Sequence, residues 1–326
     1  MADATVATFG CTLPTSGGAA DPAALRDVAQ AAEALGYDAV WVSDHLVIPA
    51  RIESPYPYSP DGAFRLGPTA PYLEPLAALA YLAGCTRRIR LGTHVLILPY
   101  RHPVVTAKVV ATLDVLSGGR VDLGVGVGWM REEFEALGHG YFDRRGAVTD
   151  EQLRVMRRLW TEDLAEFAGE FYRFAPLGAH PHPVQRPHPP IWVGGHTPAA
   201  IRRAARLGDG WLPIGARPPA ALPPEELAGG IAALRREARR AGRNPAAIRV
   251  GFSTGVTLTD AGGDRSGRGG RRPFHGSPEA IAGDIRRYLA VGVDRFVFGF
   301  GPAGPQELVA RLRRFAEQVR PAAVAG

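Results

Sequence analysis

Lysine, cysteine and long apolar segments are scarce in this sequence. Lys108 is the only lysine among 38 basic residues, and Cys11 and Cys85 are the only cysteines. Two cysteines cannot form a disulfide framework, which fits a reducing compartment. No run approaches the roughly 18 apolar residues of a transmembrane helix, and the first residues lack the basic and apolar regions of a secretory signal. We therefore expect a cytoplasmic protein without a membrane partner.

The positive charge is dispersed along the chain. The net charge is +6, yet the arginines are spread over several helical patterns, as at Arg154, Arg202 and Arg235. Nucleic-acid-binding proteins gather basic residues on one element with aromatic residues between them, so no nucleic-acid partner is expected. A small anionic ligand remains compatible with this charge. Arginine in place of lysine, with abundant alanine, glycine and proline, indicates a GC-rich source.

Strand and helix patterns alternate along the whole chain. Short runs of Val, Ile, Leu and Phe are typical of parallel strands covered on both faces, and Asp-Pro, Thr-Pro and Ser-Pro pairs begin the intervening helices. The predicted strands are Thr5–Leu13, Asp38–His45, Ile89–Ile97, Val121–Gly128, Ile191–Gly195, Gly210–Ile214, Ile248–Leu258 and Arg295–Gly301. Eight such units predict one α/β domain over residues 1–326, a TIM (β/α)8 barrel. A doubly wound sheet is the alternative, although its Gly-rich phosphate turn after the first strand is missing.

Three insertions interrupt the regular alternation. Arg51–Pro71 follows the second strand, Phe174–Pro190 precedes the fifth, and Asp260–Gly276 follows the seventh. The first and third follow the carboxyl ends of strands, where barrel enzymes keep their active sites, so we expect lids or substrate walls there. The third is equally compatible with a disordered surface segment. The aromatic residues of the first suggest an apolar or planar substrate; they are Tyr56, Tyr58, Phe64 and, just beyond it, Tyr72.

The fifth predicted strand runs into a phosphate-binding pattern. Gly194 and Gly195 let backbone approach a ligand closely, and Thr197 and Pro198 stand at the cap and first position of a helix. The amino end of a helix offers N–H groups and the positive end of its dipole to an anion. A βα turn that only needs glycine is the simpler alternative.

Polar residues also stand at the ends of the second and third strands. Asp44 and His45 would lie at the barrel mouth, where a carboxylate can tune or orient an imidazole, although neighbours in a strand point to opposite faces. His94 lies within an apolar strand and needs a partner or a ligand if it is buried. A histidine satisfied within the core is equally compatible with that position.

Glycine occupies every second position of the fourth strand. Gly124, Gly126 and Gly128 strip side chains from one face of that strand, which weakens it unless something packs there. A flat ring system is one candidate for the space, and closer packing of the protein is the other. The spacing is not a dinucleotide fingerprint, because no third glycine opens a helix.

Metal and hydrolase sites are not expected. His180 and His182 flank Pro181, with His188 nearby, but no cysteine or carboxylate stands at a spacing typical of zinc. Neither cysteine has a convincing histidine partner, and the Gly-x-Ser-x-Gly elbow is absent.

Seven segments together form a pattern of known families: Trp41–His45, Leu91–Val95, Leu116–Arg120, Gly124–Trp129, Glu133–Gly138, Ile191–Gly195 and Gly208–Trp211. In this order and spacing they resemble the bacterial luciferase-like flavin and deazaflavin oxidoreductases. The resemblance covers most of the chain and is strongest for the branch that uses the deazaflavin coenzyme F420, common in actinobacteria.

The resemblance implies where a cofactor would lie. It implies a barrel with the ring over the strand ends, supported by a non-proline cis peptide within Thr93-His94-Val95. It also implies that Gly126, Gly128 and Trp129 border the ring or the substrate, and that the phosphate lies at Gly194, Gly195, His196 and Thr197.

One position departs from the pattern of the F420-dependent sugar-phosphate dehydrogenases. Those enzymes carry an acid directly after the glycines of the fourth strand, where this chain has Trp129. Their phosphate-binding lysines also lack a counterpart, since Lys108 is the sole lysine and lies in the third helix. A sugar phosphate is therefore not the expected substrate.

The resulting hypothesis is an oxidoreductase that transfers a hydride between F420 and a small organic substrate. His45 is the expected acid/base, with Asp44 tuning it or contacting the cofactor. The alternative is a two-component monooxygenase that uses reduced FMN from a flavin reductase together with oxygen. A non-catalytic flavin-binding protein and a metal-dependent barrel hydrolase are further alternatives. The resemblance implies a homodimer.

Overall fold

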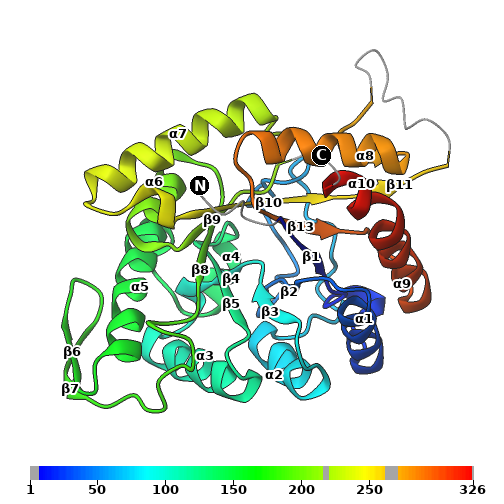
Figure 1. Ribbon diagram of the computed structural model, residues 1–326. Coiled ribbons are helices and arrows are strands. Elements are labelled where there is room, and N and C mark those ends of the chain that lie inside the picture. Colours follow the sequence, from blue (N-terminus) through cyan, green and yellow to red (C-terminus); the bar gives the residue numbers. More distant parts are fainter. Residues whose placement is uncertain (1–6, 216–219, 261–270, 325–326) are drawn as a thin grey trace.

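The computed structural model describes residues 7–215, 220–260 and 271–324, and it forms a closed parallel β-barrel ringed by helices (Figure 1). The strands pair in the order β3-β2-β1-β13-β10-β9-β8-β5-β4, and an additional β3–β5 pairing closes the ring. The barrel strands are β1 (Thr8–Thr12), β2 (Ala39–Val42), β3 (Arg90–Thr93), β4 (Leu96–Ile97), β5 (Val121–Gly126), β8 (Ile191–Gly194), β9 (Gly210–Leu212), β10 (Arg249–Gly255) and β13 (Arg295–Gly299). Together β3 and β4 make the third strand, so the barrel has eight positions, as the sequence predicts.

Proline begins most of the surrounding helices, because its fixed φ suits the first helical position. The helices are α1 (Pro22–Ala34), α2 (Pro75–Cys85), α3 (Pro103–Ser117), α4 (Arg131–Ala136), α5 (Arg145–Thr161), α6 (Pro198–Leu207), α7 (Pro224–Arg240), α8 (Pro278–Ala290), α9 (Pro305–Arg314) and α10 (Arg320–Val324). The predicted caps are confirmed: Asp21, Thr197 and Ser277 each accept a hydrogen bond from backbone N–H groups of the first turn. In the described ranges, no helix is both long enough and apolar enough to span a bilayer.

Two tryptophans fill the centre of the barrel. Trp41 and Trp192 are buried, and glycines on neighbouring strands make room for their indole rings. A Cβ added at Gly92 would lie 2.3 Å from the ring of Trp41, and one at Gly210 would lie 2.2 Å from that of Trp192. These strand glycines are therefore required by close packing inside the barrel.

Several predicted boundaries differ from the structure. The third strand is interrupted between Thr93 and Leu96, because the chain bulges there. The insertion Phe174–Pro190 is not loop throughout: it begins inside β7 (Arg173–Leu177), which pairs antiparallel with β6 (Ala165–Ala168). After β10, the short strands β11 (Thr257–Leu258) and β12 (His275–Gly276) pair with each other. The first residues of Thr5–Leu13 and most of Asp260–Gly276 lie outside the described residues.

Candidate active site

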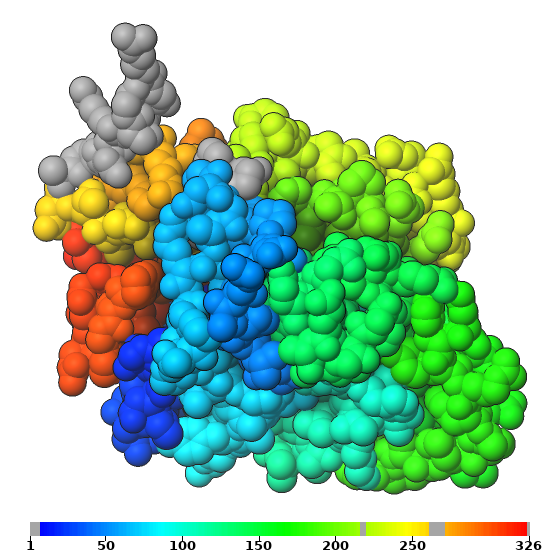
Figure 2. Space-filling view, turned by 180° about the vertical axis from the view of Figure 1, so that it is seen from behind, coloured from blue at the N-terminus to red at the C-terminus, as the bar shows by residue number. Residues whose placement is uncertain are grey.

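The carboxyl ends of the barrel strands gather most of the predicted site residues. His45 follows β2, the Thr93-His94-Val95 segment links β3 to β4, and Trp129 follows β5. Figure 2 shows the side opposite to that in Figure 1, with the blue segment that follows β2 lying across the middle of the molecule beside green residues.

A buried carboxylate orients His45. Glu133 of α4 is fully buried, and its Oε2 lies 2.7 Å from Nδ1 of His45. The same Oε2 accepts from the Tyr100 hydroxyl at 2.9 Å, and Oε1 accepts from the N–H groups of Leu46 at 2.7 Å and Val47 at 3.3 Å. Because these donors hold Glu133 in place, Nδ1 of His45 is directed at the carboxylate and Nε2 remains as the second ring nitrogen.

Asp44 does not contact His45, its neighbour in the sequence. It is buried and accepts two hydrogen bonds from Arg101, at 2.7 and 2.9 Å, and one from the N–H of Ile97 at 2.8 Å. Burial raises the pKa of the Asp44 carboxyl, and the Arg101 guanidinium opposes that shift. The carboxylate that contacts His45 is therefore Glu133, whereas Asp44 ties the end of β2 to β4.

Aromatic side chains of the loop after β2, together with Trp129 after β5, surround His45. The imidazole centroid lies 5.0 Å from the ring of Phe64 and 6.1 Å from that of Trp129. Tyr72 lies 5.4 Å from His45, and Tyr56 lies 5.1 Å from Trp129. Apart from the Glu133 contact, the surroundings of His45 are thus largely aromatic.

The bulge between β3 and β4 occupies the space left by the strand glycines. The His94–Val95 peptide is cis, as the family resemblance implies. A Cβ on Gly126 would lie 2.5 Å from Cγ2 of Val95, and one on Gly194 would lie 2.8 Å from Cγ1. Of the two alternatives for the glycines of the fourth strand, closer packing of the protein is the one observed. The Thr93 carbonyl lies beside Gly124, Val95 beside Gly126 and Phe134 beside Gly128. Gly124 and Gly126 therefore make room for the bulge.

His94 lies half-buried on the same bulge. Its Nε2 has no hydrogen-bond partner within the described part of the chain. Burial lowers the pKa of His94 to about 4, so the ring is neutral near pH 7. A buried ring nitrogen without a protein partner is a group that a bound ligand can satisfy.

The turn after β8 joins a glycine with positive φ to the capped start of α6. Gly195 has a φ of +83°, and its carbonyl accepts a hydrogen bond of 2.7 Å from the Trp211 indole. Thr197 is exposed and caps α6 through a 3.2 Å bond from the N–H of Ala200. Nδ1 of His196 has no partner among the described residues. An imidazole nitrogen and the amino end of α6 therefore adjoin the two glycines.

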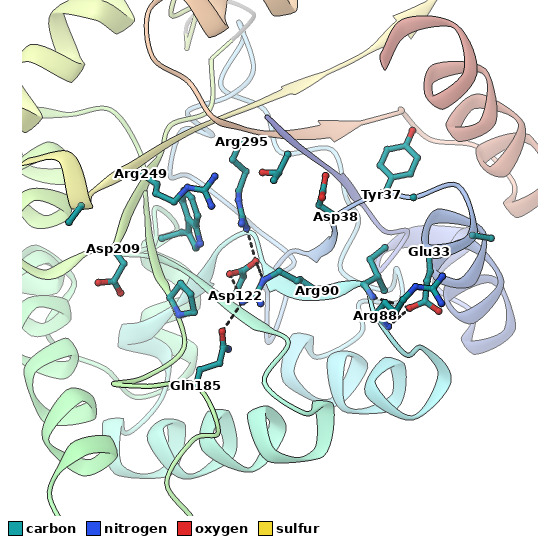
Figure 3. Close-up of a pocket in the computed structure, with 17 residues that line it drawn as sticks. Glu33, Tyr37, Asp38, Arg88, Arg90, Asp122, Gln185, Asp209, Arg249 and Arg295 are labelled. Carbon is teal, nitrogen blue, oxygen red and sulfur yellow. Dashed lines mark hydrogen bonds and ion pairs between the residues drawn. The ribbon is translucent and has the colours of Figure 1, made fainter. Parts of the chain in front are cut away.

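A charged cavity of about 830 Å³ lies at the opposite end of the barrel (Figure 3). The charged residues lining it are Glu33, Asp38, Arg88, Arg90, Asp122, Asp209, Arg249 and Arg295. Asp122 is fully buried and accepts from Arg90 at 2.8 Å and from Arg295 at 2.6 Å. Burial raises the pKa of Asp122, but Arg295 and Arg90 outweigh it and hold that pKa below its ordinary value. None of the predicted site residues lines this cavity, so the network closes the bottom of the barrel.

Sequence reasoning missed Glu133 as a functional side chain. The run Arg131-Glu132-Glu133 looks like the charged start of an exposed helix. A usable signal was its spacing, since Glu133 stands four residues before Leu137, the partly buried residue that caps α4. Arg101 and Tyr100 carried no comparable signal.

Known proteins resemble this chain along most of its length. The family model of luciferase-like monooxygenases matches residues 4–262. An uncharacterized protein of Mycobacterium tuberculosis is 39% identical over 232 residues, covering 71% of this chain and 77% of that protein. An F420-dependent glucose-6-phosphate dehydrogenase from Amycolatopsis mediterranei is 34% identical over 194 residues, covering 59% and 53%. The crystal structure of the monooxygenase RslO1 from Streptomyces bottropensis has a TM-score of 0.75 and 26% identity, covering 96% of this chain and 99% of that chain.

Proposed function

The chain belongs to the luciferase-like monooxygenase family of enzymes, and on that premise we propose that it transfers a hydride between coenzyme F420 and a small organic substrate. The observation that carries the proposal is the paired arrangement at the barrel mouth. An imidazole held by a buried carboxylate stands on one side, and on another stands a glycine turn followed by the start of α6, which Thr197 caps. The relative that uses F420 supports the choice of cofactor.

The residues at the mouth fit a ring cofactor with a phosphate tail. Nε2 of His94 and Nδ1 of His196 have no hydrogen-bond partner among the residues that the structure describes, so they are available to its polar atoms. Val95 offers an apolar surface to the ring, and the phosphate would lie at Gly194, Gly195 and the N–H groups beyond Thr197. When bound, the deazaflavin supplies or accepts the hydride at its C5 atom.

His45 provides the proton that balances the hydride. Its Nδ1 is paired with Glu133, which leaves Nε2 to hold or deliver a proton to the substrate. The carboxylate also keeps the ring oriented, because its two oxygens are held by the Tyr100 hydroxyl and by backbone N–H groups. We therefore assign His45 as the acid/base and Glu133 as its positioning residue.

The substrate is expected to be apolar or planar. Phe64, Tyr72 and Trp129 form the wall nearest to His45, and aromatic rings favour flat or apolar partners. Although the F420-dependent relative acts on glucose 6-phosphate, this chain has Trp129 where enzymes of that class carry an acid. An aromatic wall offers no charge to a sugar phosphate.

A two-component FMN-dependent monooxygenase is the second candidate. The family description and the monooxygenase RslO1 favour it. That function would require a flavin reductase as partner and would consume oxygen in the presence of reduced FMN. The glycine turn after β8 serves the phosphate of either cofactor.

Equilibrium binding of oxidised F420 and of FMN to the purified protein separates the two candidates. We expect micromolar binding of F420 and much weaker binding of FMN at low salt. A preference for FMN, with oxygen uptake in the presence of reduced FMN, would establish the monooxygenase instead. Binding of neither would overturn the cofactor site at Gly194–Thr197. Light scattering on the same samples tests the expected homodimer.

Replacement of His45 tests the acid/base role. The variant His45→Ala should lose roughly 10²-fold or more in turnover while its cofactor affinity stays close to that of the wild type. His102→Ala, an exposed histidine at the start of α3, is the matched control. Turnover of His45→Ala within about threefold of the wild type would show that another group moves the proton.

A further inference from the structure

Two histidines of the segment between β7 and β8 play no part in the proposed reaction. His180 and His182 are stacked, with ring centroids 4.4 Å apart and planes 19° from parallel. Both lie before the start of β8, on the amino-terminal side of the barrel and away from His45. Nε2 of His182 is buried and has no hydrogen-bond partner within the described ranges.

The fold brings a carboxylate to these two rings. Asp163 lies in the connection between α5 and β6, and its Oδ1 is 3.8 Å from Nε2 of His180. A Cβ on Gly178 would lie 3.5 Å from the Asp163 carbonyl and 3.6 Å from the His180 ring, so the two connections are in close contact. One ligand atom from each of Asp163, His180 and His182 lies within 4.8 Å of the other two.

We propose that Asp163, His180 and His182 bind a divalent transition-metal ion such as Zn²⁺. Imidazole nitrogen and carboxylate oxygen are both ligands of such ions. Tetrahedral zinc places ligand atoms about 3.3 Å apart, so these atoms need to approach by no more than about 1.5 Å. The side chains of Asp163 and His180 are 89% and 55% exposed, which leaves them free to rotate into place. Water completes the fourth position.

The site would join two connections at the base of the β6–β7 hairpin. Lys108 of α3 already donates a hydrogen bond to the His180 carbonyl, so the segment is anchored before any ion binds. Asp163 supplies the negative charge that offsets part of the charge of the ion. We assign this link a structural role, because the barrel mouth lies on the other side of the molecule.

Zinc binding to chelator-stripped protein tests the proposal. The protein is prepared without a polyhistidine tag, and Zn²⁺ is titrated in competition with a chromophoric chelator. We expect one ion per chain and a rise in the melting temperature. His180→Ala, His182→Ala and Asp163→Asn should each weaken the binding by at least about tenfold. The visible spectrum of the Co²⁺-loaded protein should be lost in the same variants.

Matched variants keep the result specific. His102→Ala removes an exposed histidine outside the cluster, and Glu166→Gln removes an exposed acid of β6; both should bind zinc as the wild type does. Circular dichroism checks that every variant is folded. Absence of stoichiometric zinc in the wild type would overturn the proposal, and so would unchanged binding in the His180→Ala/His182→Ala variant. Neither readout depends on the flavin-type cofactor.

Discussion

Glu133 is the single residue on which the arrangement of His45 depends most. It is fully buried and receives hydrogen bonds from a hydroxyl and two backbone N–H groups besides the imidazole. A carboxylate held in this way fixes the orientation and the tautomer of the imidazole. Carboxylates that hydrogen-bond to metal-bound histidines have the same effect on those rings.

Glu133→Gln should lower turnover by roughly 10- to 100-fold and leave cofactor affinity nearly unchanged. The amide keeps the shape of the side chain but replaces one acceptor oxygen by a donor, so it no longer holds Nδ1 of His45 as the carboxylate does. The pH profile of kcat is the second readout, because a purely structural role of Glu133 would leave that profile unchanged. Glu135→Gln, an exposed acid on the same helix, is the control. An unchanged profile in Glu133→Gln would mean that the carboxylate serves only the fold.

The bulge between β3 and β4 is the element that shapes the floor of the site. It fits because Gly126 and Gly194 leave space for the two methyl groups of Val95. Asp44 holds its far end through the N–H of Ile97 and is itself held by Arg101. Strand, bulge and buried ion pair therefore form one unit.

Gly126→Ala should displace this bulge and weaken cofactor binding, because the added Cβ would lie 2.5 Å from Cγ2 of Val95. We expect destabilisation of about 1–3 kcal/mol, the usual cost of overpacking. Val95→Ala removes the clashing methyl, so Gly126→Ala should be much better tolerated in that background. Urea unfolding and cofactor titration of the single and double variants measure the coupling. Equal losses in both backgrounds would contradict the packing explanation.

The start of α6 carries a prediction of its own. Thr197→Val removes the cap at Ala200 and should cost about 1 kcal/mol, with weaker binding of a phosphate-bearing cofactor. Thr197→Ser keeps the hydroxyl and should behave as the wild type does. Thr161→Val, at the carboxyl end of α5, controls for loss of an exposed hydroxyl. The measurements are the free energy of unfolding and the affinity for the phosphate-bearing cofactor. If Thr197→Ser lost as much stability as Thr197→Val, the cap would not explain the effect.

At the scale of the whole molecule, the barrel is closed at its bottom by buried ion pairs. Asp122 of β5 binds Arg90 of β3 and Arg295 of β13, and so connects strands from both halves of the chain. The guanidinium of Arg295 also lies 4.4 Å from the ring centroid of Trp192. Removing one partner would leave a buried charge unpaired.

Asp122→Asn should therefore destabilise the protein by about 3–5 kcal/mol near neutral pH. The pKa of Asp122 is lower in the folded protein than in the unfolded chain, where it is about 3.9. Its ion pairs therefore stabilise the fold at pH values above the unfolded pKa, and this stabilisation is lost as the pH falls through the folded pKa. Urea unfolding between neutral and acidic pH should show this loss in the wild type and a shallower acid limb in the variant. Asp27→Asn, at an exposed site of α1, should leave the limb unchanged. If the free energy of unfolding of Asp122→Asn fell as steeply at acidic pH as that of the wild type, other carboxylates would be responsible for the loss of stability in acid.

Local sequence patterns predict much of the architecture without any tertiary information. Proline after a capping residue begins helices at Pro22, Pro198 and Pro278, and glycine ends them, because φ preferences and capping act within a few residues. Apolar runs of strand length between these helices are enough to predict a parallel barrel and the place of its mouth. The glycine turn and the helix start at Gly194–Thr197 are predictable from the sequence for the same reason.

Only the tertiary structure decided which distant groups meet. Glu133 reaches His45 across 88 positions, and Asp44 turns away from its neighbour to bind Arg101. Val95 rather than a ligand fills the space beside Gly126. Asp163 likewise approaches His180 although no local spacing connects them. Such contacts depend on how separate elements pack around the barrel. The local sequence cannot predict them, because residues of the same type at other positions have similar neighbours in the sequence but different contacts in the fold.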